Sequence, residues 1–221
     1  MCFRVEVHLA TNEPIPDRVD QRQDEYVVSA EEKPSIQAVA RCHPSLASAL
    51  SRAMRVEHEY RRNGTLSYMA AWDVHRAKVF GRCESTTGIG PFERLVAQVM
   101  TQEPYASAQR VFWVVDNGSS HRGDPSIQRL RMAWPKAVLV HTPVHASWLN
   151  QGEIYLSIVE RKALTPKDVA DIAAVEQRIT DFERHYELSA KPFEWKFAHA
   201  DLSALMQRLS AEAQPSLLSA A

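Results

Sequence analysis

The sequence predicts one mixed α/β domain in which helices cover a central sheet. Three strand patterns come first, a strongly apolar strand pattern (VFWVV) lies mid-chain, and helical periodicity dominates after it. That order is typical of a layered α/β structure and not of a helical bundle or a β-sandwich. The 221 residues, 45% hydrophobic and 24% charged, suffice for one domain with an appendage and exclude a disordered chain.

The first half predicts an antiparallel meander of three strands. The first strand, residues 26–30, should end near Pro34, because proline has no amide to donate to a sheet. The second, residues 65–72, is expected to follow a turn at Asn63-Gly64. The third covers residues 77–80.

The second half alternates helices with two strands. The strand over residues 111–115 is expected to be buried on both faces, because all five residues are apolar. Ser147 is the expected N-cap of a helix that runs to Lys162. The remaining expected elements are helices at 91–99, 127–134, from 165–168 onward, and 202–209, with a short strand at 137–140.

Several classes of protein are excluded by composition. No apolar run approaches the roughly 20 residues that span a bilayer, and the first residues lack the apolar core of a signal peptide. We therefore expect an intracellular protein without a membrane partner. Three widely spaced cysteines do not indicate a disulfide framework, and no CxxC pair indicates zinc.

Charge is unevenly distributed, although the net charge is only −1. Residues 41–82 hold eight basic and three acidic side chains, and most of the basic ones are arginines. The planar guanidinium group of arginine suits phosphate, so this stretch predicts a basic face. A solvated surface without a ligand is the alternative interpretation.

Three carboxylates occupy suggestive places. Glu31 follows the first strand, Asp116 follows the most apolar strand, and Glu153 lies one turn into a helix. Polar groups at strand ends can converge along one rim of an α/β sheet. Converging carboxylates repel one another unless cations neutralise them, and Mg²⁺ prefers oxygen ligands. Taken singly, each residue is better explained as part of a turn or as an exposed surface position.

The residues around these carboxylates match a known family. The blocks are SAEEKPSIQA (29–38), EYRRNGTLSYMAAWDVHRAKVFG (59–81), DNGSSH (116–121) and HTPVHASWLNQGEIYLSIVERKALTP (141–166). With these blocks the chain resembles the DDE transposases of bacterial insertion sequences, in the mariner-like superfamily. The resemblance implies an RNase H-like fold, a mixed sheet flanked by helices.

The resemblance also implies site residues and cofactors. Glu31, Asp116 and Glu153 would form the catalytic triad and hold two Mg²⁺ or Mn²⁺ ions. The expected DNA contacts are Lys33, Arg62, His121 and Asn150. The expected partners are double-stranded DNA, as transposon ends and target, and a second copy of the chain in a homodimer.

Three departures from the family pattern bear on activity. Glu31 stands where the family has aspartate, and one extra methylene moves a carboxylate by about 1.5 Å. Gly152 stands where the family has an aliphatic residue, and glycine in a helix costs about 1 kcal/mol relative to alanine. Only about 25 residues precede the first strand, too few for the helix-turn-helix module of full-length relatives.

The sequence therefore predicts a transposase catalytic domain that cleaves DNA and transfers strands, located in the bacterial cytoplasm at the nucleoid. The expected organisation is an N-terminal extension (1–24), the catalytic domain (25–165) and a C-terminal helical extension packed on it (166–221). Two alternatives remain: a catalytically impaired or inactive remnant that folds and binds DNA, and a stand-alone RNase H-like nuclease.

Overall fold

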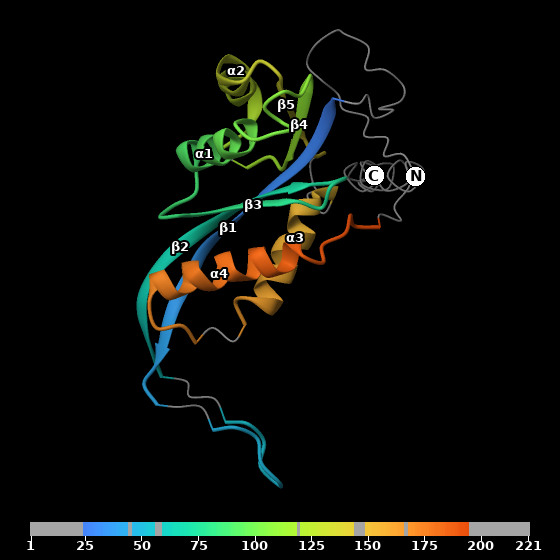
Figure 1. Ribbon diagram of the computed structural model, residues 1–221. Coiled ribbons are helices and arrows are strands. Elements are labelled where there is room, and N and C mark those ends of the chain that lie inside the picture. Colours follow the sequence, from blue (N-terminus) through green and yellow to red (C-terminus); the bar gives the residue numbers. More distant parts are fainter. Residues whose placement is uncertain are drawn as a thin grey trace, which may run out of the picture. The chain divides into compact units, whose positions relative to one another are not determined.

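Five strands form one mixed sheet in the order β3-β2-β1-β4-β5 (Figure 1). The computed structural model describes residues 24–43, 46–55, 59–118, 120–143, 149–165 and 168–194. The strands are β1 (Glu25–Arg41), β2 (Tyr60–Asp73), β3 (Val79–Glu84), β4 (Arg110–Val115) and β5 (Ala137–His141). β1 pairs antiparallel with β2 and parallel with β4, so it joins the meander to the parallel half of the sheet.

The meander is confirmed, but its strands are longer than the sequence predicts. β1 continues through Pro34 to Arg41, and the register shifts between Lys33 and Ile36. Ser35 there has a positive φ of 57°. The prediction that Pro34 ends the strand is therefore wrong, because a bulge removes the need for the missing amide.

The predicted turn at Asn63-Gly64 is also wrong. Both residues lie inside β2, where Gly64 has φ 109°, a conformation open to glycine. The side chain of Asn63 makes a long-range hydrogen bond: its Nδ2 donates to the carbonyl oxygen of Ala170 at 2.6 Å. A long-range contact thus replaces the local turn.

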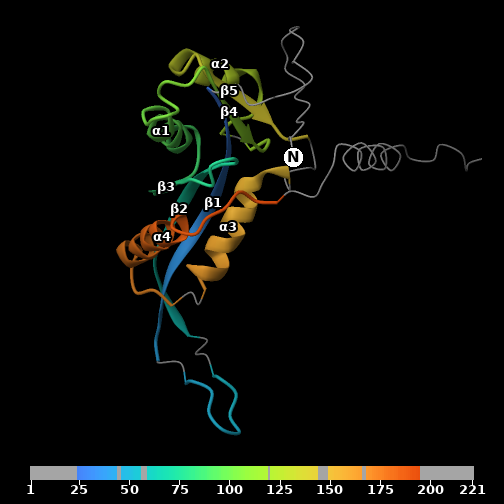
Figure 2. The same cartoon turned by 45° about the vertical axis from the view of Figure 1, so that its right-hand side comes forward.

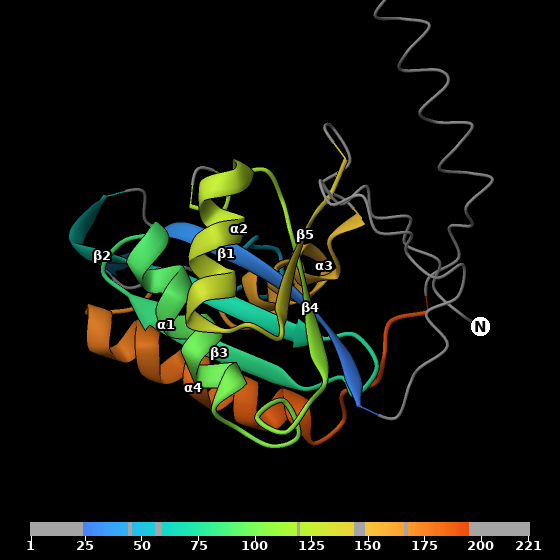
Figure 3. The ribbon, with the colours of Figure 1, turned by 90° about the horizontal axis from the view of Figure 1, so that it is seen from above.

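Within the described ranges, four helices cover the two faces of the sheet. They are α1 (Ile89–Met100), α2 (Gly123–Ala133), α3 (Gln151–Lys162) and α4 (Ile172–Glu187). α1 and α2 lie on one face, and α3 and α4 lie on the other (Figures 1 and 3). Alternate residues of β2 show the division: Met69 packs in the core under α1, while Tyr68 contacts Tyr155 of α3.

The core between the sheet and α1 contains the central residues of β4. Trp113 is fully buried there, with its ring 6.1 Å from that of Phe92 in an edge-to-face contact. Phe112, which points to the other face, is only half-buried. The prediction that β4 is fully buried on both faces therefore holds for one face alone.

The helix predicted to open at residues 165–168 begins later. α4 starts at Ile172 and is capped by Asp171, whose side chain accepts from Ala174 N. Val169 forms a bridge with Val39 instead of joining the helix. The predicted cap Ser147 and the predicted helix at 202–209 lie outside the described residues. No helix in the described part of the chain is long and apolar enough to span a membrane.

Candidate active site

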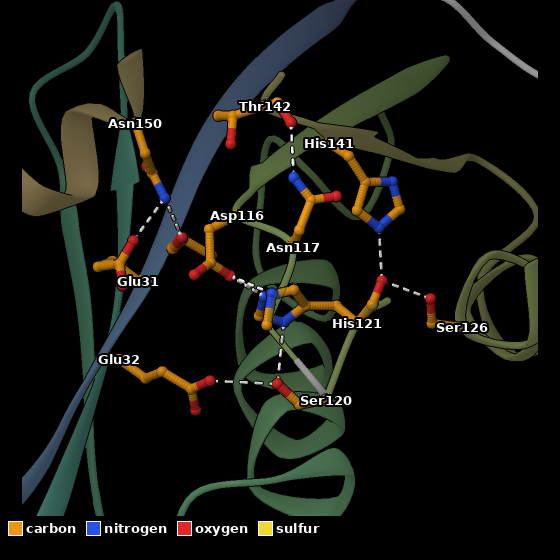
Figure 4. A network of polar contacts seen from close by, with 12 residues as sticks. Glu31, Glu32, Asp116, Asn117, Ser120, His121, Ser126, His141, Thr142 and Asn150 are labelled. Carbon is orange, nitrogen blue, oxygen red and sulfur yellow. Dashed lines mark hydrogen bonds and ion pairs between the residues drawn. The ribbon is translucent and has the colours of Figure 1, made fainter. Parts of the chain in front are cut away.

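Parallel pairing of β1 and β4 brings Glu31 and Asp116 to one rim of the sheet. The ladder pairs Ser29 with Val114. Two residues further along, Glu31 on β1 and Asp116 just past β4 come into register. Figure 4 shows their side chains side by side.

The N-terminus of α3 reaches the same rim because of Gly152. A Cβ on this residue would lie 2.8 Å from the Cβ of Glu31 and 3.3 Å from the carbonyl oxygen of Ser29. The first distance is shorter than real Cβ contacts allow, so a side chain would push α3 away from β1. The helical cost predicted for Gly152 is therefore only part of its role, since the glycine also permits the close approach of α3 to β1.

Hydrogen bonds of the Asn150 side chain connect α3 to β1. Its side-chain oxygen accepts from Gly152 N at 3.0 Å, which caps α3. Its Nδ2 donates to Glu31 Oε2 at 2.8 Å and to the carbonyl of Ala30 at 2.7 Å (Figure 4). Ser29 Oγ donates to the same amide oxygen. The amide is fully buried and bonded within the protein, so it orients Glu31.

The negative charges of Asp116 and Glu153 act on the carboxyl group of Glu31. The pKa of Glu31 is raised to about 7, first by burial, then by the negative charge of Asp116 and, more weakly, that of Glu153. Glu153 is thus close enough to act on Glu31 from the first turn of α3. A bound cation would relieve this unfavourable charge at Glu31.

His121 holds Asp116 from the opposite side. Its Nε2 lies 2.5 Å from Asp116 Oδ1, and this hydrogen bond, followed by the amide of Gly118, lowers the pKa of the aspartate. The imidazole is 4% exposed, so it is buried beside Asp116. Asp116 keeps its second oxygen free of these bonds.

A second layer of contacts supports the histidine. Nδ1 of His121 lies 3.0 Å from Ser120 Oγ, which donates to Glu32 Oε1 at 3.2 Å (Figure 4). On the backbone side, His141 Nε2 contacts the carbonyl of His121 at 2.5 Å. Glu32 thus contacts Ser120 whereas Glu31 contacts Asn150, and the charge of Glu32 is the smallest of the contributions that raise the pKa of Glu31.

The two basic residues expected to contact DNA, Lys33 and Arg62, have different surroundings. Lys33 forms an ion pair with Glu160 of α3 at 2.9 Å, so its charge is already partly neutralised. Arg62 is exposed on β2, with its guanidinium 5.8 Å from the centre of the Tyr60 ring. Neither residue joins the carboxylate network.

The donor set of the rim fits a divalent cation in its chemistry. It consists of carboxylate oxygens, which Mg²⁺ and Mn²⁺ prefer, and its repulsion would be reduced by positive charge. Among the described residues, however, no three histidine, cysteine or acidic side chains stand close enough together to hold an ion as they are placed. The described structure thus brings carboxylates to one rim of the sheet but does not place three of them close enough together to share an ion.

Some residues of the site are not evident from sequence. Ser29 and Glu32 are separated from their partners by 121 and 88 positions, so no local pattern marks them. Ser120 could have been noticed, because it adjoins His121 in the DNGSSH block. Trp148, two positions before Asn150 in the sequence, is outside the described residues.

The sequence matches a known protein family over the stretch that contains most of this site. A family model described as DDE superfamily endonuclease matches residues 40–175, more than half of the chain. The protein belongs to this family. Asp116 and Glu153 lie inside the matched stretch, and Glu31 lies before it. No curated protein matches the sequence.

Solved structures show the same fold. The Mos1 mariner paired end complex with Mn matches with a TM-score of 0.57 at 14% identity, over 85% of this chain and 56% of that chain. A pre-cleavage Mos1 transpososome matches with a TM-score of 0.56 at 14% identity, over 86% and 56%. The chain thus spans little more than half the length of the Mos1 chain and shares its RNase H-like fold.

Proposed function

We propose that this protein is the catalytic domain of an insertion-sequence transposase, which cleaves DNA and transfers strands with the help of divalent cations. The observation that carries the proposal is the placement of Glu31 and Asp116 side by side at one rim of the sheet, with Glu153 close enough for its charge to act on Glu31. Membership of the DDE superfamily endonucleases supports it. The same proposal includes a bacterial source and duplex DNA as substrate.

Each part of the site has a definite task in this proposal. Glu31, Asp116 and Glu153 would hold two Mg²⁺ or Mn²⁺ ions, which supply activation of the attacking oxygen and stabilisation of the leaving oxygen. Asn150 fixes the carboxylate of Glu31, and His121 fixes that of Asp116. Because Asn150 and His121 are buried, we assign them positioning roles in place of the DNA contacts expected from sequence.

Replacing Asp116 with asparagine tests the proposal. The amide oxygen can still accept from His121, so the fold should survive while the negative charge is lost. We expect Mn²⁺ binding by calorimetry to weaken at least tenfold and cleavage of a labelled duplex to disappear. The matched control is Asp124→Asn, an exposed acid in the first turn of α2. Equal cleavage by Asp116→Asn and wild type would refute the proposal.

An impaired or inactive remnant is the second candidate. It is favoured by the glutamate at position 31 and by the absence of a closed ion site among the described residues. Metal ligands need placement within about 0.5 Å, and the extra methylene exceeds this tolerance. Cleavage assays of wild type and Glu31→Asp with Mn²⁺ separate the candidates. Faster cleavage by Glu31→Asp than by wild type indicates that wild type is impaired. Any cleavage by wild type excludes an inactive chain.

A further inference from the structure

The distal ends of β1 and β2 continue into a two-stranded ribbon. We define this ribbon arm as the described residues 39–43, 46–55 and 59–62. Arg61 pairs with Ala40, and the backbone bonds continue outward through Leu46 and Arg55, 2.9 and 3.0 Å, to Ala49 and Arg52. Figures 1 and 2 show the arm leading away from the helices that cover the sheet.

The base of the arm is braced on one side. Val39 bridges Val169, and Arg41 forms an ion pair with Asp168 at 3.4 Å. Arg41 lies ten positions after Glu31 on β1, which corresponds to about 30 Å along a strand. The base of the arm therefore lies about 30 Å from the carboxylate rim, measured along β1.

Positive charge is concentrated on the arm. Arg52, Arg55, Arg61 and Arg62 are all exposed, and Glu59 is the one acid among the arm's described residues. The chain as a whole has a net charge of −1, so this concentration is local. Such a distribution creates a field that attracts a polyanion.

We propose that the ribbon arm binds duplex DNA about one helical turn away from the phosphodiester at the carboxylate rim. A two-stranded ribbon fits the major groove, and arginines suit the phosphates beside it. One turn of B-DNA is about 34 Å, which matches the arm's distance from Glu31. The inference rests on the proposed function in one respect, that DNA is the bound polymer.

The tip of the arm also exposes apolar side chains. Leu50 is fully exposed, Met54 is 62% exposed and Leu46 is 47% exposed. A second copy of the chain could cover these residues. The basic strands favour DNA, and the experiment includes a variant that distinguishes the two partners.

The test measures binding of a 40-base-pair duplex by fluorescence anisotropy in EDTA, over a series of NaCl concentrations. Arg55→Ala/Arg61→Ala is compared with Arg131→Ala/Arg184→Ala, which removes the same charge from exposed positions on α2 and α4. Each lost phosphate contact lowers the slope of log affinity against log salt by about 0.9. We expect a reduction of about 2 for the arm variant and none for the control.

Equal slopes for the two double variants would overturn the proposal. A second outcome would also overturn it. If light scattering shows that wild type is a dimer and that Leu50→Ser/Met54→Ser is not, while the arginine variant binds DNA as wild type does, the arm binds a second copy of the chain. Thermal unfolding of every variant verifies the fold. Because EDTA removes divalent cations, the binding result is independent of catalysis. An arm effect in EDTA, combined with no cleavage by wild type when Mg²⁺ or Mn²⁺ is added in a separate assay, leaves this inference standing and counts against the proposed function alone.

Discussion

The imidazole Nε2 of His121 lies 2.5 Å from Oδ1 of Asp116, in a position where the histidine is almost completely buried. The bond lowers the pKa of the aspartate and leaves its other oxygen for a ligand. A carboxylate fixed in this way is pre-oriented, which is how partners behind a metal ligand generally act. The relationship leads directly to the first prediction.

Replacing His121 with alanine should weaken Mn²⁺ binding by about 10–100-fold, the usual effect of losing a partner behind a ligand. The pKa of Asp116 should rise toward its ordinary value, because the hydrogen bond that lowers it is gone. Calorimetry measures the affinity, and carboxyl NMR titration of the metal-free protein measures the pKa. Ser120→Ala, which keeps the direct bond, should have a smaller effect on both. An unchanged pKa in His121→Ala would contradict the assignment.

Gly152→Ala should destabilise the protein, although alanine is the better helix former. The helix gains about 1 kcal/mol in propensity, but the new Cβ would lie 2.8 Å from that of Glu31, and overpacking costs about 1–3 kcal/mol. Urea unfolding measures the net change. The control is Gly90→Ala in α1, where the nearest atom is the flexible end of Arg94 at 3.4 Å. Stabilisation of Gly152→Ala would show that α3 can move away without cost.

Asn150→Ala should lower the free energy of unfolding by about 2 kcal/mol or more. Loss of an N-cap alone costs about 0.5–2 kcal/mol, and the carboxylate of Glu31 also loses its donor. Asn150→Asp retains a cap for Gly152 N but places a second carboxylate against Glu31. Its stability should therefore fall further at pH 8 than at pH 5, whereas the alanine variant should vary less with pH. Parallel pH profiles of the two variants would argue against the contact.

Glu84 should stabilise the fold above about pH 4.5 and lose this effect in acid. The hydrogen bond from Arg94, aided by Arg82, lowers its pKa from 4.5 to about 2. A lowered pKa in the folded state means that the contribution is complete above the unfolded value and disappears between pH 4.5 and pH 2. Urea unfolding of wild type and Glu84→Gln should differ at pH 6 and converge near pH 2. Glu93→Gln, whose carboxylate lies 3.8 Å from Arg129, is the control with little effect.

Periodicity in the sequence predicted the number and order of most elements. The apolar run of β4 and the spacing of Phe92, Leu95 and Val99 in α1 are local patterns, and the described structure confirms both. Predictions from single turn residues were less successful. Pro34 and Gly64 both lie inside strands, because pairing along a long ladder outweighs the local preference of one residue.

The order of the motifs identified the carboxylates of the rim, but not how they are held. Asn150 reaches Glu31 across 119 positions, and Ser120 reaches Glu32 across 88. No local signal can encode such contacts, since they depend on which strands become neighbours and on how closely α3 approaches β1. The glycine at 152 illustrates the difference, because its helical cost follows from sequence alone while its steric role depends on Glu31.

The sequence by itself determined the mixed α/β class and the elements around the site, and it singled out Glu31, Asp116 and Glu153 as candidates, because periodicity and motif order are properties of the chain. The tertiary structure decided the rest: the parallel register that sets Asp116 beside Glu31, the buried amide of Asn150, and the pKa of about 7 at Glu31. These depend on distances between segments remote in sequence, and packing alone fixes such distances.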